Sequence, residues 1–547
     1  MTISTCNIFK DGLPSIGYFF EKYPRRLLPA DAMVTRFAPS PTGYMHIGGV
    51  YIALISQRFA NQTKGVYFLR IEDTDKVREV EGTKTVIIES LHRYGLDPDE
   101  GMCFGGGEKG DYGPYSQSER MKIYQSFIRY LMECGRAYPC FCTKEELDVR
   151  REEQEKLHVT TGYYGQWARC RNLPKPQAEE MIKSGKDFVI RLKSVGVDRE
   201  FMFNDLIKGS IQLPSNNKDA ILMKSDGFPT YHLAHVVDDY LMGTTHVFRS
   251  DDWVSSIPLH CELFDAFGFI RPAYGHVPPI TKIDENGGRR KLSKRKDPEA
   301  NVLFYQKIGF PEEAVIEYLL NLANSDFENW RKLNPEKSHS EFIIDLKRFS
   351  NTAGPLFDEI KLRDVSKDII ANMDAGEVFL RVLEWSIRYD ISFHSILKES
   401  QNLWTNIFSI ERGGLKKRKD ICTWSEINAQ FSYVHSAGFT SPDWSEFQSV
   451  LSLIEIRKVL DQFRRIYSNL DDLEEWMKKI RVIAVNIDLA PDIKTFKKNR
   501  EKYRGHVGEV SQVIRYAITG KVKTPDLHQI MHFLGDDECK KRLAQNI

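Results

Sequence analysis

The sequence of 547 residues predicts an α/β fold in which a parallel sheet is split by an inserted domain and followed by an all-helical C-terminal region. Three observations lead to this prediction. Residues 34–71 have the pattern of a strand, a helix and a strand; residues from about 110 to 215 break that pattern; and strand signals fade beyond about residue 300. The chain also exceeds the roughly 300 residues at which a single core stops growing, so several domains are expected.

Composition narrows the class of protein. Hydrophobic residues make up 41% and charged residues 28%, which is typical of a soluble globular protein. No run of about 18 apolar residues is present, so no membrane span is expected. The 77 basic and 76 acidic residues leave a net charge of +1, which points to no partner, and nine cysteines are too few for a disulfide scaffold. A reducing, cytoplasmic location is therefore expected.

The first 32 residues have no apolar segment followed by a small-residue cleavage site, so they are not a signal peptide. Asp11, Glu21 and Asp31 also argue against an organelle leader. We expect residues 1–32 to be an upstream extension or an overlong start, with translation beginning at Met33.

The parallel sheet is predicted from the segment that follows Met33. A strand is expected over Val34–Phe37 and a second over Val66–Ile71, and the residues between them have apolar side chains at helical spacing: Ile47, Val50, Tyr51, Leu54 and Phe59. A strand, a helix and a strand in so few residues form a βαβ unit, which implies parallel strands.

The remaining elements follow in order. A polar helix is expected over Lys144–Lys156 inside the insert, and the α/β pattern resumes at Ile221–Lys224. A strand over His246–Arg249 is then capped by Ser250 and Asp251 before a helix. Long helical patterns cover Val450–Ile466 and Leu473–Ile480. The predicted domains are 1–32, 33–115, 116–215, 216–285, 286–370 and 371–547.

A motif over residues 36–49, Arg-Phe-Ala-Pro-Ser-Pro-Thr-Gly-Tyr-Met-His-Ile-Gly-Gly, lies where the first strand gives way to the first helix. Ligands often bind at this junction, because backbone N–H groups and the helix dipole face it. Its glycines would let a phosphate approach the backbone, and His46 could donate to it. Alone, the motif is equally consistent with a proline-rich turn, and it matches neither the P-loop nor the dinucleotide fingerprint.

A second motif, Lys-Leu-Ser-Lys-Arg at 291–295, lies in the basic run 289–296. Two lysines three residues apart on a flexible loop can follow negative charge as it develops on a departing pyrophosphate. Alone, such a run is more often a solvated loop.

Together, the two motifs resemble the signatures of class I aminoacyl-tRNA synthetases, from which they depart at Gly49, Leu292 and Arg295. The wider context resembles bacterial-type glutamyl-tRNA synthetases, in which the residues at Gly49 and Arg295 are usual. The matching segments are 36–43, 69–75, 229–234 and 237–243. The resemblance extends from about Met33 to the C-terminus. It implies a Rossmann-like catalytic domain, an insert that binds the acceptor stem, a stem-contact domain and helical anticodon-binding domains.

The resemblance also implies an activity: ATP-dependent ligation of L-glutamate to tRNA through a glutamyl-adenylate, with Mg²⁺, and transfer to the 2′-hydroxyl of the terminal adenosine. Catalysis is assigned to His46, Gly48, Lys291 and Lys294, and ATP binding to these together with Gly49, Trp253 and Ser293. Arg36 would bind the side-chain carboxylate of glutamate, Arg249 the α-carboxylate and Glu72 the ammonium, with Ser40 and Tyr231 donating or accepting hydrogen bonds. His235 stands where relatives often have Asn, which would alter a substrate contact or make it pH-sensitive.

Four of the nine cysteines lie within 37 residues, between Cys134 and Cys170. The set Cys140, Cys142, Tyr164 and Cys170 resembles the zinc site of some family members, although the Tyr-to-Cys spacing is longer here. Zinc binding and simple packing of free cysteines remain equal alternatives.

The interval 478–523 holds twelve Lys and Arg residues against four acids, a local charge of +8. A basic helical surface can be plain solvation, but the anticodon-binding domain of the family occupies this stretch, so tRNA contact is expected at Lys497, Lys498 and Arg500. The partner is glutamate tRNA; the choice of glutamine tRNA in addition stays open, and the resemblance implies a monomer.

Three other functions compete. Glutaminyl-tRNA synthetases share the fold but usually carry Pro and Glu at the positions of Ala38 and Ser40, and have β-barrel anticodon domains. A short relative that modifies a tRNA base lacks the anticodon-binding part. A catalytically inactive paralogue is disfavoured because His46, Lys291 and Lys294 are all present.

Overall fold

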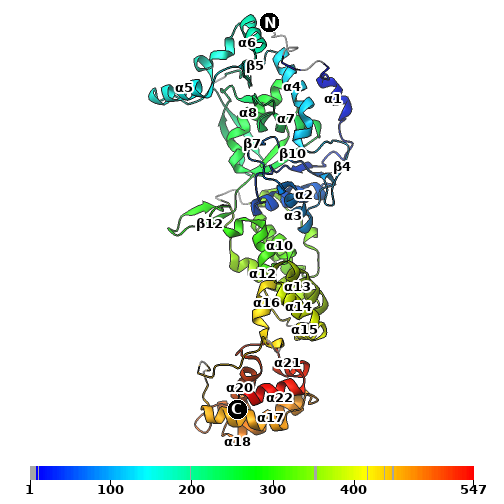
Figure 1. Cartoon of the computed structure of the whole chain (residues 1–547), viewed down its shortest axis with the longest axis vertical. Helices are drawn as coiled ribbons and strands as arrows, with labels where there is room; N and C mark the ends of the chain where they lie inside the picture. Colours follow the sequence, from blue (N-terminus) through cyan, green and yellow to red (C-terminus); the bar gives the residue numbers. More distant parts are fainter. Residues whose placement is uncertain are drawn as a thin grey trace. The chain divides into compact units, whose positions relative to one another are not determined.

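The computed structural model describes residues 8–9, 12–196, 199–349, 354–414, 417–435, 438–445, 447 and 449–546. The chain divides into two compact units (Figure 1). The first comprises residues up to 304 together with 316–358, and the second comprises 305–315 together with 359 to the end. Each unit is described by itself.

The predicted βαβ unit is confirmed. Strand β1 (Val34–Phe37) pairs in parallel with β2 (Val66–Leu69), with Val34 opposite Val66, and helix α2 (Ile47–Gln62) connects them. Every apolar residue named for this helix is at most 3% exposed. Strand β3 (Glu100–Met102) continues the sheet in parallel, and β4 (Glu108–Lys109) closes it in antiparallel. Helix α3 spans Thr83–Arg93.

The second half of the α/β domain joins the first beside β1. Strand β10 (His246–Ser250) pairs in parallel with β11 (Ala273–Val277), and the amide of Thr245 donates to the carbonyl of Val34 at 3.0 Å. The sheet is thus built from segments far apart in the sequence, as predicted.

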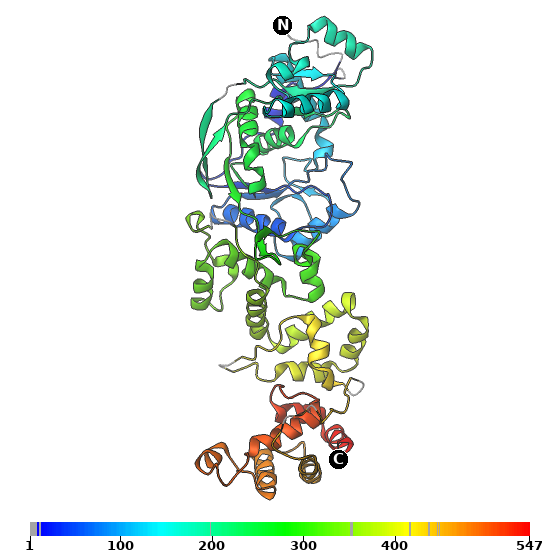
Figure 2. The ribbon, with the colours of Figure 1, turned by 90° about the vertical axis from the view of Figure 1, so that its left-hand side faces the viewer.

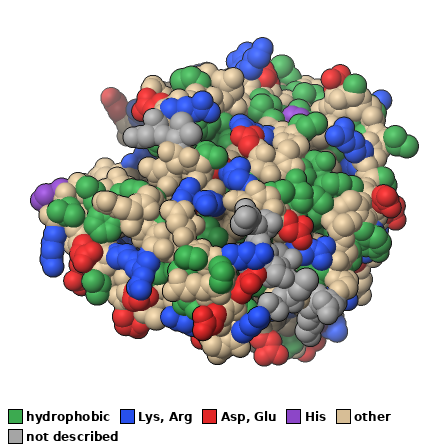
Figure 3. All heavy atoms as spheres, turned by 90° about the horizontal axis from the view of Figure 1, so that it is seen from above, with side chains coloured by type: hydrophobic (Ala, Val, Ile, Leu, Met, Phe, Trp, Pro, Cys, Tyr) green, Lys and Arg blue, Asp and Glu red, His purple; other side chains and the backbone are tan. Residues whose placement is uncertain are grey.

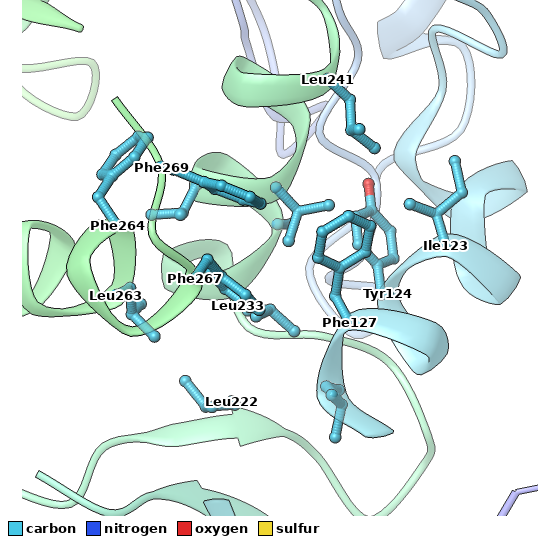
Figure 4. Packing of buried hydrophobic residues seen from close by; sticks show 14 of the residues in the cluster. Ile123, Tyr124, Phe127, Leu222, Leu233, Leu241, Leu263, Phe264, Phe267 and Phe269 are labelled. Atoms are coloured by element: carbon cyan, nitrogen blue, oxygen red, sulfur yellow. The ribbon is translucent and has the colours of Figure 1, made fainter. Parts of the chain in front are cut away.

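Three helices cover the sheet and bury the largest core of the first unit: α4 (Met121–Glu133), α7 (Tyr231–Leu241) and α8 (Ile257–Phe267). Figure 4 shows their side chains meeting, with Phe127 and Tyr124 of α4 facing Leu233 and Leu241 of α7 and the aromatic residues Phe264, Phe267 and Phe269. This core holds α7, and with it several side chains of the site described below.

The insert has its own small sheet of β5 (Ala137–Cys140), β6 (Val189–Leu192) and β9 (Ile221–Met223), all antiparallel. The prediction that the α/β pattern resumes at Ile221 was wrong, because this strand pairs with β6 and completes the insert. A three-residue apolar strand carries no signal of the sheet it joins. A hairpin of β7 (Glu200–Asp205) and β8 (Gly209–Pro214), which can be followed in Figure 2, and helices α5 (Lys144–Lys156) and α6 (Lys175–Lys183) complete the insert.

The described residues before Met33 pack within the first unit, and the expectation of an upstream extension or an overlong start stays a prediction. Helix α1 (Ile16–Lys22) buries Phe19, and Tyr23 donates to the carbonyl of Gly113 at 2.8 Å. Arg26 forms a bidentate ion pair with Glu100, with both contacts at 2.7 Å. These partners lie far along the chain, which is why the segment itself gave no sign of them.

Beyond the hairpin of β12 (Thr281–Ile283) and β13 (Arg289–Lys291), the described residues form helices and isolated β-bridges but no further strand, as predicted. Their bounds are α9 Val302–Ile308, α10 Glu312–Ala323, α11 Asp326–Leu333, α12 Glu359–Asn372, α13 Ala375–Tyr389, α14 Ile391–Glu399, α15 Gln401–Ser409, α16 Trp424–Gln430, α17 Leu453–Ile466, α18 Leu473–Asn486, α19 Ile493–Lys498, α20 Val507–Thr519, α21 Leu527–Leu534 and α22 Asp536–Gln545. None of the helices in the described ranges is both long enough and apolar enough to cross a bilayer.

The charged surface is mixed. On the face shown in Figure 3, basic and acidic side chains lie interspersed with hydrophobic ones. This distribution agrees with the net charge of +1 and explains why bulk charge identifies no partner.

Candidate active site

A pocket of about 540 Å³ lies where β1, β2 and β10 end. Arg36 and Arg249, both at strand ends, line it together with Glu72, which follows β2, and with Ser40 and Tyr231. The sequence predicted all five for one ligand, and the fold brings all five to one cavity. Parallel strands that end at one edge explain the convergence.

Arg36 is 3% exposed, and two hydrogen bonds from its guanidinium to the protein fix its orientation. Its Nε donates to a carboxylate oxygen of Asp239 at 3.2 Å, and its Nη1 donates to the carbonyl of Phe248 at 3.3 Å. Among the described residues nothing accepts from Nη2, so this nitrogen is left for an anion in the pocket.

Asp239 and Arg70 extend this contact into a buried network that the sequence analysis missed. Arg70 donates to Asp239 at 2.6 Å and to Glu72 at 3.0 Å. Burial raises the pKa of Glu72, although Arg70 and Arg36 oppose the rise. Burial would also raise the pKa of Asp239, but Arg36 and Arg70 outweigh it and hold that pKa well below the usual value. The two arginines and two carboxylates of this network balance in charge.

Arg249 is different, because in the described chain it makes no ion pair with a carboxylate. It is 5% exposed. Its donors are satisfied by neutral groups: Nε by His276 at 2.9 Å, Nη1 by His260 at 3.2 Å and Tyr231 at 3.4 Å, and Nη2 by the carbonyl of Trp253 at 3.3 Å. A buried cation without a counter-charge is costly unless a ligand supplies one. The pocket is therefore built for an anion at Arg249.

The histidines around Arg249 are neutral at pH 7. Burial lowers the pKa of His232 to about 4 and of His235 to about 3, and it lowers those of His260 and His276 as well. Of the two effects predicted for His235, a pH-sensitive substrate contact is contradicted by this low pKa, whereas an altered contact stays a prediction. This ring is fully buried behind the pocket, with Nδ1 2.9 Å from Asp239 in a poorly aligned contact and Nε2 2.9 Å from the hydroxyl of Tyr274.

A second pocket, of about 500 Å³, adjoins the first and shares Ile52 and Ser250 with it. It brings together both sequence motifs, which are some 245 residues apart: its lining includes His46, Gly48, Gly49, Lys291, Ser293 and Lys294. Trp253, predicted to lie near ATP, lines the first pocket instead, with its ring 4.2 Å from that of Tyr231.

His46 connects the two motifs directly. Its Nδ1 accepts from the amide of Gly48 at 2.9 Å as the cap of α2, which leaves Nε2 to donate to the carbonyl of Leu292 at 3.1 Å. A Cβ on Gly48 would come within 3.0 Å of that imidazole, so glycine preserves the contact. Burial lowers the pKa of His46, although its hydrogen bond to Leu292 opposes the shift.

The two lysines of the basic loop (residues 289–296) contact groups that a phosphate could replace. Lys294 donates to the carbonyl of Tyr44, and Lys291 pairs with Asp252, whose side chain is 57% exposed. The base of the loop is firmer, because Asp297 accepts from Arg290 at 2.6 and 2.7 Å and from the amide of Ser293 at 2.8 Å. The lysine ends are thus free to transfer to a phosphate while the loop base stays in place.

The cysteine cluster in the insert contains three of the four predicted ligands. The Sγ atoms of Cys140, Cys142 and Cys170 all lie within 4.8 Å of one another. The prediction of Tyr164 was wrong: its hydroxyl donates to the carbonyl of Thr160 at 2.6 Å. The neighbouring Tyr163 takes its place, with its hydroxyl 3.3 Å from Cys140 and from Cys142. Adjacent residues face opposite ways, and the motif could not tell which one faces the thiols.

In the second unit, Lys497 and Lys498 end α19 and are exposed with Arg500, and none of the three has an ion-pair partner in the described residues. Two other basic residues of the 478–523 stretch are paired, Lys479 with Asp471 and Arg504 with Glu455. The three predicted positions are thus among the cations of this stretch that are open to a phosphate.

Comparison with known proteins agrees with this site. The model of the class I tRNA synthetase (E and Q) catalytic domain matches residues 32–348, and an anticodon binding domain model matches 455–547. Glutamate–tRNA ligases from Clostridium perfringens and Acetivibrio thermocellus are 41% and 42% identical over 96% and 97% of this chain, and over 96% and 97% of their own. The second match leaves fewer residues uncovered than the 32 before Met33, so part of that segment is shared with relatives.

A solved structure of a glutamate tRNA ligase from Elizabethkingia meningosepticum, in complex with its amino acid, is 27% identical and covers 94% of this chain and 99% of its own, with a TM-score of 0.76. The parallel sheet, the two adjoining pockets, the matched domains and the identity over nearly the whole chain lead to one conclusion: the chain belongs to the class I tRNA synthetases for E and Q, as a member of the glutamate–tRNA ligase family.

Proposed function

We propose that this protein attaches L-glutamate to tRNA in an ATP-dependent reaction that passes through a glutamyl-adenylate and releases AMP and pyrophosphate. One observation carries the proposal. A pocket with an uncompensated buried arginine adjoins a pocket with the lysines and the helix N-terminus that a triphosphate needs. A carboxylate held in the first pocket is therefore next to a phosphate held in the second.

Glutamate has two carboxylates and one ammonium, and the first pocket offers a matching group for each. We assign the side-chain carboxylate to Arg36, the α-carboxylate to Arg249 and the ammonium to Glu72, with Ser40 and Tyr231 as hydrogen-bonding groups. The support is the open Nη2 of Arg36, the missing counter-charge of Arg249 and the position of Glu72 on the same wall. Glutamine keeps the α-carboxylate for Arg249 but presents a neutral amide to the open Nη2 of Arg36, and the hydrogen bond to this amide is weaker than the charge-assisted bond to a carboxylate.

In the second pocket we assign ATP, which carries Mg²⁺, to His46, Gly48, Gly49, Lys291, Ser293 and Lys294. Lys291 and Lys294 leave Asp252 and the Tyr44 carbonyl and follow the negative charge that develops as pyrophosphate departs. Alignment of the α-carboxylate with the α-phosphorus then does most of the remaining work. The 2′-hydroxyl of the terminal adenosine receives the glutamyl group, as in other class I enzymes.

For tRNA, we propose that the insert, which the pairing of β9 with β6 extends to Met223, binds the acceptor stem, that residues 286–370 contact the stem, and that residues 371–547 bind the anticodon region. The unpaired Lys497, Lys498 and Arg500 support phosphate contact in the last of these. We propose that glutamate tRNA is the partner. We further propose that the protein acts as a monomer in the cytoplasm.

We further propose that Cys140, Cys142, Cys170 and the phenol of Tyr163 hold one structural Zn²⁺, which would crosslink the insert. Three closely grouped thiols and a phenol that accepts from the amide of Cys170 at 3.0 Å fit a four-coordinate site. Metal analysis of protein purified without chelator should find about one equivalent of zinc, lost in Cys140→Ser and kept in the exposed Cys134→Ser. Less than about a tenth of an equivalent in the wild type would end the metal proposal.

ATP–pyrophosphate exchange tests the main function. We expect exchange with glutamate in the presence of tRNA and little with glutamine. Exchange that prefers glutamine would favour the glutaminyl alternative, and no exchange under any condition would favour an inactive tRNA-binding protein; either result would overturn the proposal.

A further inference from the structure

The contacts behind Arg249 suggest how a buried cation without a counter-charge is held in place. Arg249 leaves β10, and its Nε donates to Nε2 of His276 on the adjacent strand β11. His276 is itself fully buried, and its Nδ1 lies 2.6 Å from a carboxylate oxygen of Asp205 at the end of β7. Three side chains from three strands thus form a continuous chain of hydrogen bonds.

The direction of each hydrogen bond in this chain is determined. A guanidinium can only donate, so Nε2 of His276 must accept and carry no proton. A neutral imidazole then has its proton on Nδ1, which donates to Asp205. Asp205 fixes the tautomer of His276, and this tautomer presents a lone pair to Arg249.

Asp205 is well placed to impose this tautomer. One of its oxygens accepts from the amides of Ile207 and Lys208, each at 2.9 Å, and both oxygens lie 3.2 Å from the amide of His276. Burial would raise the pKa of Asp205, but the hydrogen bonds from His276 and from these amides hold that pKa below its usual value. The carboxylate is therefore both rigid and ionised.

We infer that Asp205 and His276 are positioning residues for amino-acid binding: together they fix the orientation of the Arg249 guanidinium that receives a carboxylate of the amino acid. Neither residue lines the pocket. Asp205 belongs to the hairpin of the insert, and the amide of Leu206 next to it donates to the carbonyl of Tyr274 in β11 at 2.8 Å. The insert thus completes the amino-acid site. The inference rests on the proposed function, because it needs the anion at Arg249 to be the substrate.

Two substitutions of His276 separate orientation of Arg249 from plain packing. In His276→Gln the side-chain oxygen can reach the position of Nε2 and still accept from Arg249. In His276→Asn the amide reaches only the position of Nδ1, so the contact with Asp205 is kept and the contact with Arg249 is lost. We expect the KM for glutamate in ATP–pyrophosphate exchange to rise about tenfold to a hundredfold in H276N and to stay within about threefold in H276Q.

Asp205→Asn tests the tautomer. The one oxygen of the substituted amide is held by the two backbone amides, so its NH₂ group faces Nδ1 of His276 and moves the ring proton to Nε2, against the donor of Arg249. We expect D205N to match H276N in the KM for glutamate, with an unchanged KM for ATP. Asp219→Asn is the control: this buried aspartate of the insert bonds Tyr138 and Ser194, so D219N should lower thermal stability and leave the ratio of the two KM values unchanged.

The result that would overturn the inference is an unchanged KM for glutamate in H276N, an equal rise in the KM for glutamate and for ATP, or an H276Q variant as impaired as H276N. If D205N does not fold, the two His276 variants decide alone. Absence of exchange in the wild type would instead refute the proposed function, so the two failures are distinguishable.

Discussion

The two adjoining pockets hold their charges in opposite ways. In the first, Arg36 and Arg249 are 3% and 5% exposed and are fixed by contacts from strands β10 and β11 and from helices α7 and α8. In the second, the side chain of Lys291 is 49% exposed and its partner Asp252 is 57% exposed. The comparison indicates that the amino-acid pocket is preorganised, whereas the nucleotide pocket depends on a loop whose lysines exchange partners during the reaction.

Removing a charge from the buried network tests the preorganised pocket most severely. Asp239→Asn leaves Arg36 and Arg70 buried without a full counter-charge, which costs about 3–5 kcal/mol. We expect the midpoint of thermal unfolding to fall by more than about 5 °C and the KM for glutamate to rise. The exposed pair of Asp265 with Arg271 is the control, and D265N should change neither; equal effects of both variants would contradict the contrast between the pockets.

Substitutions in the basic loop of the second pocket should lower the rate of exchange without changing the stability of the fold. Lys294→Ala removes a cation that stabilises the charge developing as pyrophosphate leaves, so kcat for exchange should fall about 10²- to 10³-fold with the thermal midpoint unchanged. Lys296→Ala, on the same loop and outside the pocket lining, should retain nearly full rate. Full exchange by K294A would remove our assignment of the loop.

The segment before Met33 extends the comparison, because its Arg26 supports the helix that carries residues of the amino-acid pocket. Arg26 donates to the carbonyl of Met242, the C-cap residue of helix α7, as well as to Glu100. Since α7 carries Asp239 and Tyr231, Arg26→Ala should destabilise the first unit by about 1–3 kcal/mol and raise the KM for glutamate more than that for ATP. Arg25→Ala, without a partner in the described residues, is the matched control. Deletion of residues 1–32 without any loss of stability would contradict this role.

The smallest effect on either pocket is expected from the second unit. Reversing Lys497 and Lys498 to Glu should raise the KM for tRNA roughly tenfold and leave the KM values for glutamate and ATP unchanged. Lys398→Glu, an exposed lysine outside the basic stretch, should leave tRNA kinetics as they are. Equal behaviour of the two variants would argue for plain solvation of the basic surface.

Features that depend on neighbouring residues could be predicted from the sequence, whereas features that depend on distant segments could not. The βαβ unit, His46, Lys291 and Lys294 follow from local periodicity and short motifs, and the resemblance supplied the five lining residues of the first pocket. The sequence analysis did not predict contacts between distant segments, because no local sequence pattern indicates them. Asp205 meets His276 across 71 residues, and Tyr23 meets Gly113 across 90.

The other wrong predictions concern residues whose local sequence fits two structural roles equally well. Of the adjacent residues Tyr163 and Tyr164, only one ring can face the thiols, and the backbone conformation of the insert determines that it is Tyr163. His235 reads as a titratable site residue, but burial behind the pocket lowers its pKa to about 3 and keeps it neutral. The strand at Ile221 is apolar in either sheet, and pairing with β6 decides its place.

A crystal structure of the protein with L-glutamate bound tests the account most directly. We expect one carboxylate of glutamate within about 3 Å of the Arg249 guanidinium, the other at Arg36, and the ammonium facing Glu72, with the side chains behind them unmoved. Glutamate bound with neither carboxylate at Arg249, or in the pocket of His46, would contradict the account.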